Sequence, residues 1–255
     1  MPFPHLLLAA ALSHSPWQET LQRFVTPQAR VDYAALNKQG LPTLDAYLAT
    51  LAQPFPRDVS RDERKAALIN AYNALTVRWV AAHYPIPSIW RTKHPFTEVR
   101  HTVDGRKYSL DQIETELRDM GDPRVHAVLV CAARSCPPLR REAYVAERLD
   151  AQLTANTLAW LSNPALNEFD PTAREAEVSQ IFEWYGSDFG ASPWGLLRFL
   201  STYGPPHAKW MYQHGSGKRL VRYREYYWGL NDAGTAGDAY GYWSFRFDYL
   251  RNKYL

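Results

Sequence analysis

The segment that begins at Ser60 constrains the fold most, because it predicts one long helix with a broad apolar face. Ser60 followed three residues later by Glu63 is the pattern of a capping box, which marks a helix N-terminus. The sequence His83-Tyr84-Pro85 ends this helix, since a proline disfavours helical backbone in the residue before it. One apolar arc at helical spacing contains Leu68, Ile69, Tyr72, Leu75, Thr76, Trp79 and Val80.

Two asparagines interrupt this apolar face. Asn73 lies inside the edge of the arc, and Asn70 lies just beyond it. An amide at a core-facing position is costly unless its hydrogen-bonding positions are used. In one interpretation both amides bind a neighbouring backbone and hold it against the helix. In the other, they line a pocket and bind substrate.

A second stretch, residues 122–144, carries the candidate chemistry. It holds both cysteines of the chain, Cys131 and Cys136, with His126 close upstream. The short, valine-rich run at residues 125–130 predicts a buried strand. A loop containing Cys136 and then a helical pattern follow the predicted strand, and loops held by rigid elements are common places for chemistry.

A hairpin is the clearest β signal. Asp104-Gly105, flanked by short β-like runs, predicts a hairpin over residues 100–108. With the strand at 125–131 and several helices, this gives an α+β fold in which helices pack on a small, mainly antiparallel sheet. No composition break suggests a linker, so residues 17–255 are expected to form a single globular domain. A helix placed before a sheet that bears Cys and His also invites comparison with the papain and transglutaminase layout, although there the nucleophilic cysteine begins the helix.

Composition and charge exclude several classes of protein. Apolar residues make up 46% and charged residues 22%, as in soluble globular proteins. The net charge of +3 is too small to indicate nucleic acid or an anionic membrane as a partner. No stretch reaches the roughly 18 apolar residues of a membrane span. Oligomeric state is not constrained by the sequence.

The N-terminus has two interpretations. Residues 6–12 (LLLAAAL) match the apolar core of a signal peptide, which is about 7–15 residues long, but no Lys or Arg precedes them. Residues 1–16 are therefore either a signal peptide or a disordered or helical leader. A signal peptide would make the protein periplasmic or secreted, and its absence would make it cytoplasmic.

The two cysteines are expected to differ in role. Cys131, at the end of the predicted strand, fits a small core residue. Cys136, just before a predicted helix, could be held as a thiolate by the helix N-terminus and act as nucleophile. His126 is one candidate base, although a regular strand would place it about 16 Å from Cys131 and on the opposite face. Two cysteines and one histidine at this spacing match no standard zinc site, and no metal or cofactor is expected.

Five motifs in this order resemble one family. They are INAYNALTV (69–77), VDGRKYSLDQIE (103–114), DPRVHAVLVCAARSCPPLRREAY (122–144), IFEWYGSDFG (181–190) and YREYYWGLND (223–232). They are similar to the bacterial and plant family known as domain of unknown function 547. The resemblance spans roughly residues 17–232 and implies positions rather than a reaction. It also implies export, since bacterial members often carry a signal.

The positions shared with these motifs provide the candidate site. The catalytic candidates are Cys136, His126 and Glu114. Glu114 lies beside the apolar stripe of its helix, where most glutamates are in solvent. The candidates for substrate binding are Asn70, Asn73, Cys131, Arg134, Tyr185 and Asp188.

Two functions follow from this set. A thiol, a carboxylate, an imidazole and two amides are what a thiol-dependent hydrolase or acyl transferase acting on an amide or thioester would contain. The alternative is a non-catalytic module that binds a small molecule or peptide on an aromatic-rich face. That face is predicted from Trp184, Tyr185, Tyr226, Tyr227 and Trp228.

Overall fold

The fold is organised around α4 (Arg61–His83), a long and largely buried helix. The computed structural model describes residues 12–172, 175–190, 192–214 and 221–254. As predicted, the side chain of Ser60 accepts a hydrogen bond from the backbone N–H of Glu63, at 3.1 Å. The elements packed around α4 in this half of the chain include α2 (Tyr33–Ala35), η1 (Leu36–Gly40), α3 (Leu41–Leu51) and α5 (Leu110–Asp119). The first helix, α1 (Ser15–Phe24), packs on α3.

The predicted hairpin is confirmed. Strands β1 (His101–Val103) and β2 (Arg106–Tyr108) pair antiparallel as a two-stranded sheet. Asp104 and Gly105 both have positive φ, 52° and 67°, which a tight two-residue hairpin turn requires. Ser109 and Gln112 then form a complete capping box at the start of α5, as the sequence indicates.

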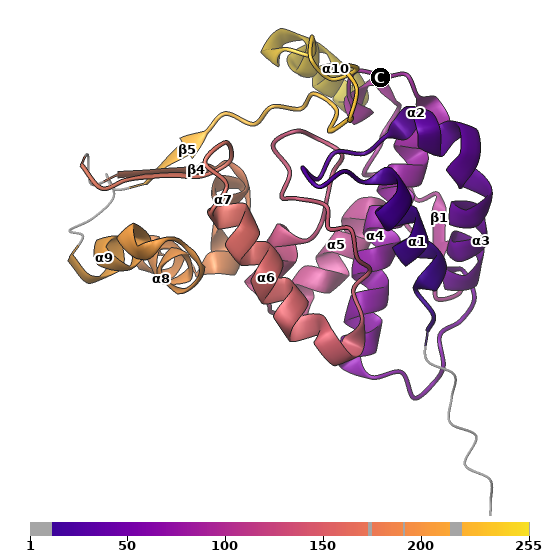
Figure 1. Cartoon of the computed structure of the whole chain (residues 1–255), viewed down its shortest axis with the longest axis horizontal. Coiled ribbons are helices and arrows are strands. Elements are labelled where there is room, and N and C mark those ends of the chain that lie inside the picture. Colours follow the sequence, from indigo (N-terminus) through magenta and orange to yellow (C-terminus); the bar gives the residue numbers. More distant parts are fainter. Residues whose placement is uncertain (1–11, 173–174, 191, 215–220, 255) are drawn as a thin grey trace, which may run out of the picture.

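The second sheet lies at the other end of the molecule (Figure 1). Strands β3 (Glu168–Asp170) and β4 (Glu175–Ser179) are antiparallel, whereas β4 and β5 (Val221–Arg224) are parallel. Two helices cover this mixed sheet, α8 (Pro193–Tyr203) and α9 (Pro206–His214). The α+β class is therefore confirmed, with the strands divided between two small sheets.

The strand predicted at residues 125–131 is wrong. Residues there form η3 (Pro123–Ala127), a 3-10 helix, followed by an irregular buried loop. In a sheet, a neighbouring strand would form hydrogen bonds with the backbone of this segment. Here Asn73 forms them instead: its Nδ2 donates to the carbonyl of Val128, and its Oδ1 accepts from the N–H of Val130. After the cysteines, helical structure begins only with η4 (Ala146–Arg148) and α6 (Leu149–Leu161), so no helix starts directly after Cys136.

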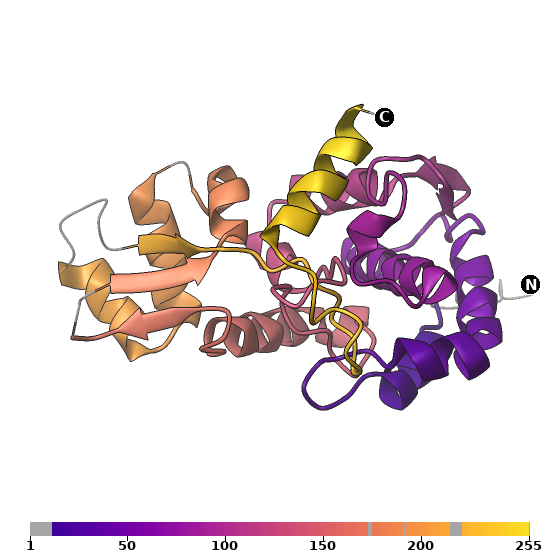
Figure 2. The same cartoon turned by 90° about the horizontal axis from the view of Figure 1, so that it is seen from above.

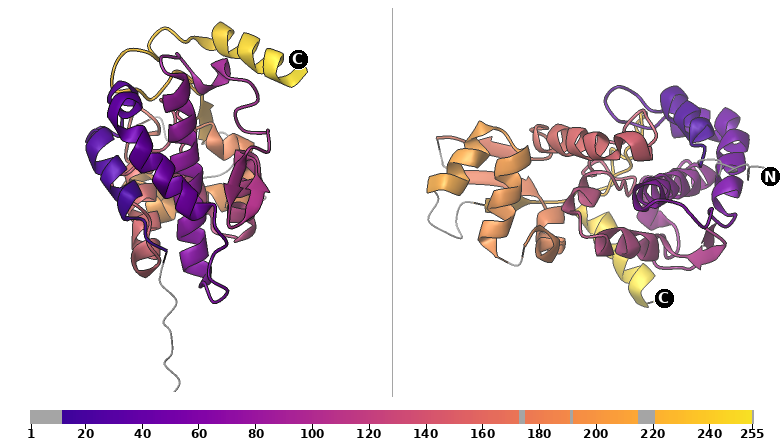
Figure 3. Two further views of the ribbon diagram at one scale, coloured as in Figure 1. Left: turned by 90° about the vertical axis from the view of Figure 1, so that its right-hand side faces the viewer. Right: turned by 90° about the horizontal axis from the view of Figure 1, so that it is seen from below.

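The C-terminal segment connects the two ends of the molecule. After β5 the chain runs back to the N-terminal half, as Figure 2 shows in yellow. There Leu230 pairs with Ala133 and donates its N–H to the carbonyl of Pro87. The chain ends in α10 (Tyr242–Tyr254), which packs on η2 (Ile89–Arg91) and stands at the edge of the molecule in both views of Figure 3.

The predicted leader lies mostly outside the described part, since residues 1–11 are not described. Within the described ranges, no helix combines the length and apolarity needed to cross a membrane.

Candidate functional site

A cavity of about 700 Å³ lies between α5, the cysteine loop, the segment after β5 and α10. Half of its lining residues are aromatic, and the polar ones include Asp111, Glu114, His126 and Cys131. The aromatic lining consists of Tyr72, Trp90, Phe96, Trp184, Tyr185, Tyr226, Trp228, Tyr242, Phe245 and Tyr249. The site is therefore a largely aromatic cavity that also carries polar groups, the usual form of a small-molecule site.

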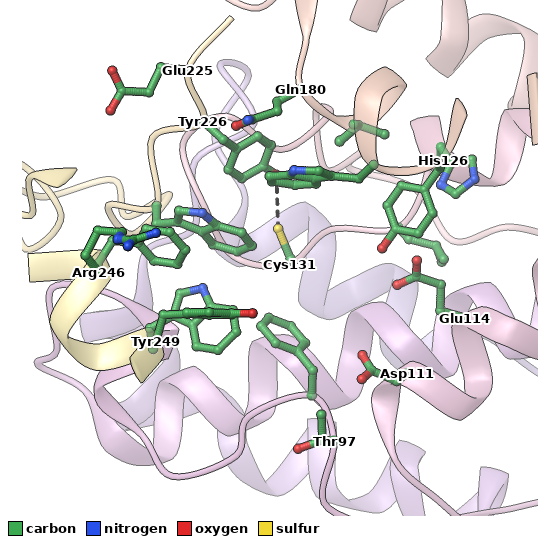
Figure 4. Close-up of a pocket in the computed structure, with 18 of the residues that line it drawn as sticks. Thr97, Asp111, Glu114, His126, Cys131, Gln180, Glu225, Tyr226, Arg246 and Tyr249 are labelled. Carbon is green, nitrogen blue, oxygen red and sulfur yellow. Dashed lines mark hydrogen bonds between the residues drawn. The ribbon is translucent and has the colours of Figure 1, made fainter. Parts of the chain in front are cut away.

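Cys131 lies in the middle of the cavity lining, below Tyr226 in Figure 4. Its Sγ is 3.1 Å from the phenolic oxygen of Tyr226. The same phenol donates to Sγ of Cys136 at 3.2 Å, so one hydroxyl contacts both sulfurs. Both cysteines are free.

Cys136 is buried behind this wall and accepts several hydrogen bonds. The backbone N–H groups of Cys131 and Ala133 donate to its Sγ at 3.1 and 3.3 Å. Ala132, between these donors, has a φ of 63°, a left-handed conformation that turns successive N–H groups toward one acceptor. The loop backbone, rather than the helix N-terminus expected from the sequence, therefore surrounds this sulfur with donors.

The two thiols are electrostatically unequal. Burial alone would raise the pKa of Cys136, but hydrogen bonds from Cys131, Tyr226 and the backbone outweigh burial and lower it below its ordinary value. Burial and the neighbouring Cys136 sulfur raise the pKa of Cys131. The pair thus loses its first proton readily, and the resulting negative charge rests mainly on Cys136.

Glu114 lines the same cavity as Cys131 and is half-buried, so the expectation that it lies in solvent is wrong. Burial raises the pKa of Glu114, and a hydrogen bond with Tyr185 only partly offsets this effect. Burial and the carboxylate of Glu114 together raise the pKa of Tyr185. A carboxyl group in this setting can hold a proton at a higher pH than an exposed glutamate.

His126 borders the same cavity and is held by Asp188. Its Nε2 is 2.8 Å from Oδ2 of Asp188, which also accepts from Nε of Arg118 at 2.6 Å. The hydrogen bond from Arg118 and that from His126 keep the pKa of Asp188 at about 2, so its carboxylate is ionised and can only accept. Nε2 therefore carries the hydrogen, and Nδ1 is the nitrogen able to take a proton. Burial lowers the pKa of His126 below its ordinary value.

The aromatic side of the cavity is a connected set of ring contacts. Trp228 stacks on Trp184 and on Phe245, with centroids 5.9 and 5.3 Å apart. Trp90 meets Trp228 edge to face at 5.4 Å. The ring of Tyr185 contacts the His126 ring in a tilted arrangement, with centroids 4.3 Å apart, and so joins this wall to the polar end.

Four predicted binding residues, Asn70, Asn73, Arg134 and Asp188, lie outside the cavity lining. Asn70 and Asn73 bind backbone groups on the far side of the cysteine loop, which confirms the interpretation in which the amides hold a neighbouring backbone. Arg134 donates to the carbonyl of Leu230 and forms an ion pair with Asp238. These residues position the walls of the cavity and are not part of its lining.

The exposures of the two cysteines are the reverse of those expected. Cys131 is partly exposed in the cavity, whereas Cys136 is only 5% exposed. The sequence reasoning also missed the contributions of Tyr72, Trp90, Asp111 and α10. The only signal for α10 was the abundance of aromatic residues after position 219, which gave no indication of where that segment would pack.

No group of three or more His, Cys, Asp or Glu side chains suited to a metal ion occurs among the described residues. Comparison with curated proteins and with solved structures found no match. One family model, described as a protein of unknown function, DUF547, matches residues 56–161. The matched range contains α4, the hairpin, α5, the cysteine loop and α6, together with Glu114, His126 and Cys131. The chain therefore carries a DUF547 family domain over residues 56–161.

Proposed function

We propose that this protein is a thiol-dependent hydrolase or acyl transferase that acts on an amide or thioester, with Cys131 as nucleophile. The observation that carries the proposal is the position of the Cys131 thiol in the lining of the aromatic cavity. The role expected for Cys136 from the sequence passes to Cys131, because a sulfur that is only 5% exposed is poorly placed to reach a substrate carbonyl.

Cys136 and Tyr226 would activate this nucleophile. A thiol must lose its proton to attack, and burial holds the pKa of Cys131 high. The neighbouring Cys136 sulfur can accept this proton, and the phenol of Tyr226 is within 3.2 Å of both sulfurs. In this scheme Cys131 Sγ bonds to the carbonyl carbon while its proton moves to Cys136.

Glu114 and His126 would serve the remaining proton transfers. A carboxyl group whose pKa is raised can protonate the departing amine or thiolate. The result is an S-acyl Cys131. His126 is kept neutral by burial and oriented by Asp188, and its Nδ1 could take the proton of the water or acceptor that releases the acyl group.

A non-catalytic binding module is the second candidate, and the aromatic lining favours it. Trp184, Tyr185, Tyr226 and Trp228 of the predicted aromatic face line the cavity. Tyr227 does not, because its hydroxyl donates to the carbonyls of Gly237 and Asp238. Such a cavity would bind an apolar or aromatic ligand with or without a reaction at the thiol.

Acyl thioesters with aromatic and aliphatic acyl groups distinguish these candidates. Intact mass should show one acyl adduct, peptide mapping should place it on Cys131, and thiol release should exceed the uncatalysed rate. Cys131→Ser should lose both signals. Tyr226→Phe should slow the release by about tenfold or more, while Tyr227→Phe, which changes the adjacent tyrosine outside the cavity, should retain it.

Binding without reaction would support the second candidate. In that case aromatic ligands would quench tryptophan fluorescence equally in the wild type and Cys131→Ser, with no adduct and no thiol release. Acylation that is confined to surface lysines, or that persists in Cys131→Ser, would contradict the proposed enzyme.

A further inference from the structure

The outer face of α10 carries a continuous apolar stripe. Trp243, Phe247, Leu250 and Tyr254 are 81%, 65%, 42% and 71% exposed. Their spacing of four, three and four residues places all four on one side of the helix. Exposed apolar residues that occur singly need no explanation, but a contiguous set of large ones marks an interaction surface.

The opposite face of α10 is firmly attached to the protein. Asp248, which is fully buried, accepts from the hydroxyl of Tyr240 at 2.9 Å and pairs with Arg91 at 3.1 Å. Asn252 accepts from the N–H of His94 and donates to the carbonyl of Trp90. Because its inner face is already satisfied, α10 cannot turn to bury the stripe without breaking these bonds.

The charged side chains of α10 are arranged around the stripe. On a helical wheel Arg246 and Lys253 lie on one side of it and Arg251 lies on the other. Arg246 and Lys253 are exposed, while Arg251 binds the carbonyls of Trp90 and Arg91. The one acidic residue of the helix, Asp248, is buried. The exposed charges of α10 are therefore basic.

We infer that α10 lies on the surface of an anionic lipid bilayer, with the stripe in the headgroup region and the basic side chains at the lipid phosphates. Helices that bind in this way carry Trp, Phe and Leu on one face and Lys or Arg beside it. The net charge of the whole chain gives no indication of this surface, because the basic groups are concentrated locally. Figures 1 and 3 show α10 at the edge of the molecule, where a flat surface can reach it.

A second copy of the chain is a poorer match for this face. Thirteen helical residues extend about 20 Å, and with a helix width of roughly 10 Å the face covers about 200 Å². A stable protein interface needs about 800 Å² from each partner. A bilayer requires no such area, since each inserted side chain contributes separately.

The membrane surface would also be close to the cavity. Tyr242, Phe245, Arg246 and Tyr249, on the flank and inner side of α10, line the cavity. This placement does not depend on the chemistry proposed for Cys131.

Co-flotation of the full chain with lipid vesicles tests the inference. The protein should bind vesicles of phosphatidylglycerol and phosphatidylcholine, bind pure phosphatidylcholine more weakly, and dissociate as salt is added. Trp243→Ser/Phe247→Ser should lower the partition coefficient by about tenfold or more. Trp194→Ser, which removes a 49% exposed tryptophan from α8, is the matched control and should bind like the wild type. The apolar residues 6–12 are shared by all variants, so the difference between them reports on α10.

Brominated lipids provide a second measurement, because they quench the fluorescence of tryptophans that lie in the bilayer. They should quench part of the tryptophan fluorescence of the wild type but less of it in the double variant. Failure of the wild type to bind anionic vesicles, or equal binding by the double variant, would overturn the inference. A wild-type dimer that the double variant converts to a monomer would instead assign the stripe to a second copy.

Discussion

Asn70 binds the backbone of Tyr144 in both directions: its Nδ2 donates to the carbonyl at 2.8 Å, and its Oδ1 accepts from the N–H at 2.9 Å. Asn70→Ala leaves two buried backbone groups without partners, each costing about 1–3 kcal/mol. We expect the free energy of unfolding to fall by about 4 kcal/mol in urea titration. Asn163→Ala, at a less buried site where the Oδ1 of Asn163 accepts from the N–H of Ala165, should cost less than about 1 kcal/mol. Unchanged stability with altered ligand binding would restore the pocket interpretation for Asn70.

His14 should make stability depend on pH between neutrality and pH 4. Burial lowers its pKa from 6.5 to about 4, and its Nδ1 is 2.8 Å from the hydroxyl of Tyr47. As pH falls through 6.5, the unfolded chain takes up a proton that the folded chain does not. Stability is therefore full above about pH 6.5 and declines toward pH 4, by up to about 3 kcal/mol.

Denaturant titrations at several pH values would measure this decline. His14→Gln should show a smaller decline than the wild type over the same range. A residual decline is expected because burial also lowers the pKa of His101 to about 4. Identical curves for the two proteins would show that His14 is protonated in the folded state.

The thiol pair should titrate as a unit. The first proton leaves with a lowered pKa because Cys136 accepts hydrogen bonds, while Cys131 is the sulfur that reagents can reach. Burial and the neighbouring Cys136 sulfur raise the pKa of Cys131, so the midpoint of iodoacetamide labelling of Cys131 against pH should lie above the ordinary thiol value of about 8.5. Cys136→Ala removes the neighbouring charge and should move this midpoint downward, whereas Tyr226→Phe removes a hydrogen bond to the Cys131 sulfur and should move it upward. A midpoint that stays the same in Cys136→Ala would show that Cys131 ionises alone.

Glu114→Gln should stabilise the protein while removing its activity. Burial raises the pKa of Glu114 in the folded protein. The stability of the protein therefore decreases as pH rises above 4.5, the pKa of this glutamate in the unfolded chain. The neutral amide does not bear this cost, so we expect Tm at pH 7 to rise by roughly 2–4 °C. Thioester turnover by the same variant should fall by about 10²-fold or more. A lower Tm would indicate that the carboxylate is stabilised where it lies.

Location and mechanism can be tested together. We propose that residues 1–16 direct export, on the basis of the apolar run at 6–12. Protein from its native host should then lack the leader by intact mass. A mass increase of about 2 Da on reduction would mean that Cys131 and Cys136 form a disulfide there, and this would remove the thiol that the enzyme needs. A full-length N-terminus would contradict export.

Local signals in the sequence predicted local structure well. Ser60 and Ser109 cap the helices that they begin, and Asp104-Gly105 makes the hairpin turn. Each of these features depends on residues within four positions of one another. The α+β class follows from the same signals.

The cysteine loop could not be predicted in this way. A short apolar run looks the same in a buried strand and in a buried loop, and only the partner of its backbone distinguishes them. That partner is Asn73, 55 residues from Val128. Because residues 125–131 do not form a strand, His126 and Cys131 are not held about 16 Å apart on opposite faces. Both residues line one cavity.

The burial of Glu114 depends on residues that are still farther away in the sequence. Its helix was predicted correctly, but Tyr185 and the C-terminal segment turn a position expected in solvent into part of a cavity wall. The same holds for the cysteines, since Tyr226 covers Cys136 and leaves Cys131 beside the open space. The residue types of the site were thus foreseen, but not which sulfur faces the ligand.

The hydrogen bond between Tyr226 and Cys131 joins residues 95 positions apart, and this has a consequence during translation. At about 5–20 residues per second, the ribosome needs roughly 5–20 s to add the phenol after the cysteine. Throughout that interval the nascent chain contains the two thiols but neither Tyr226 nor the aromatic wall that follows it. Synthesis of the complete DUF547 match ends at residue 161, well before the cavity can close, so a prematurely terminated chain would carry the family domain with uncovered cysteines.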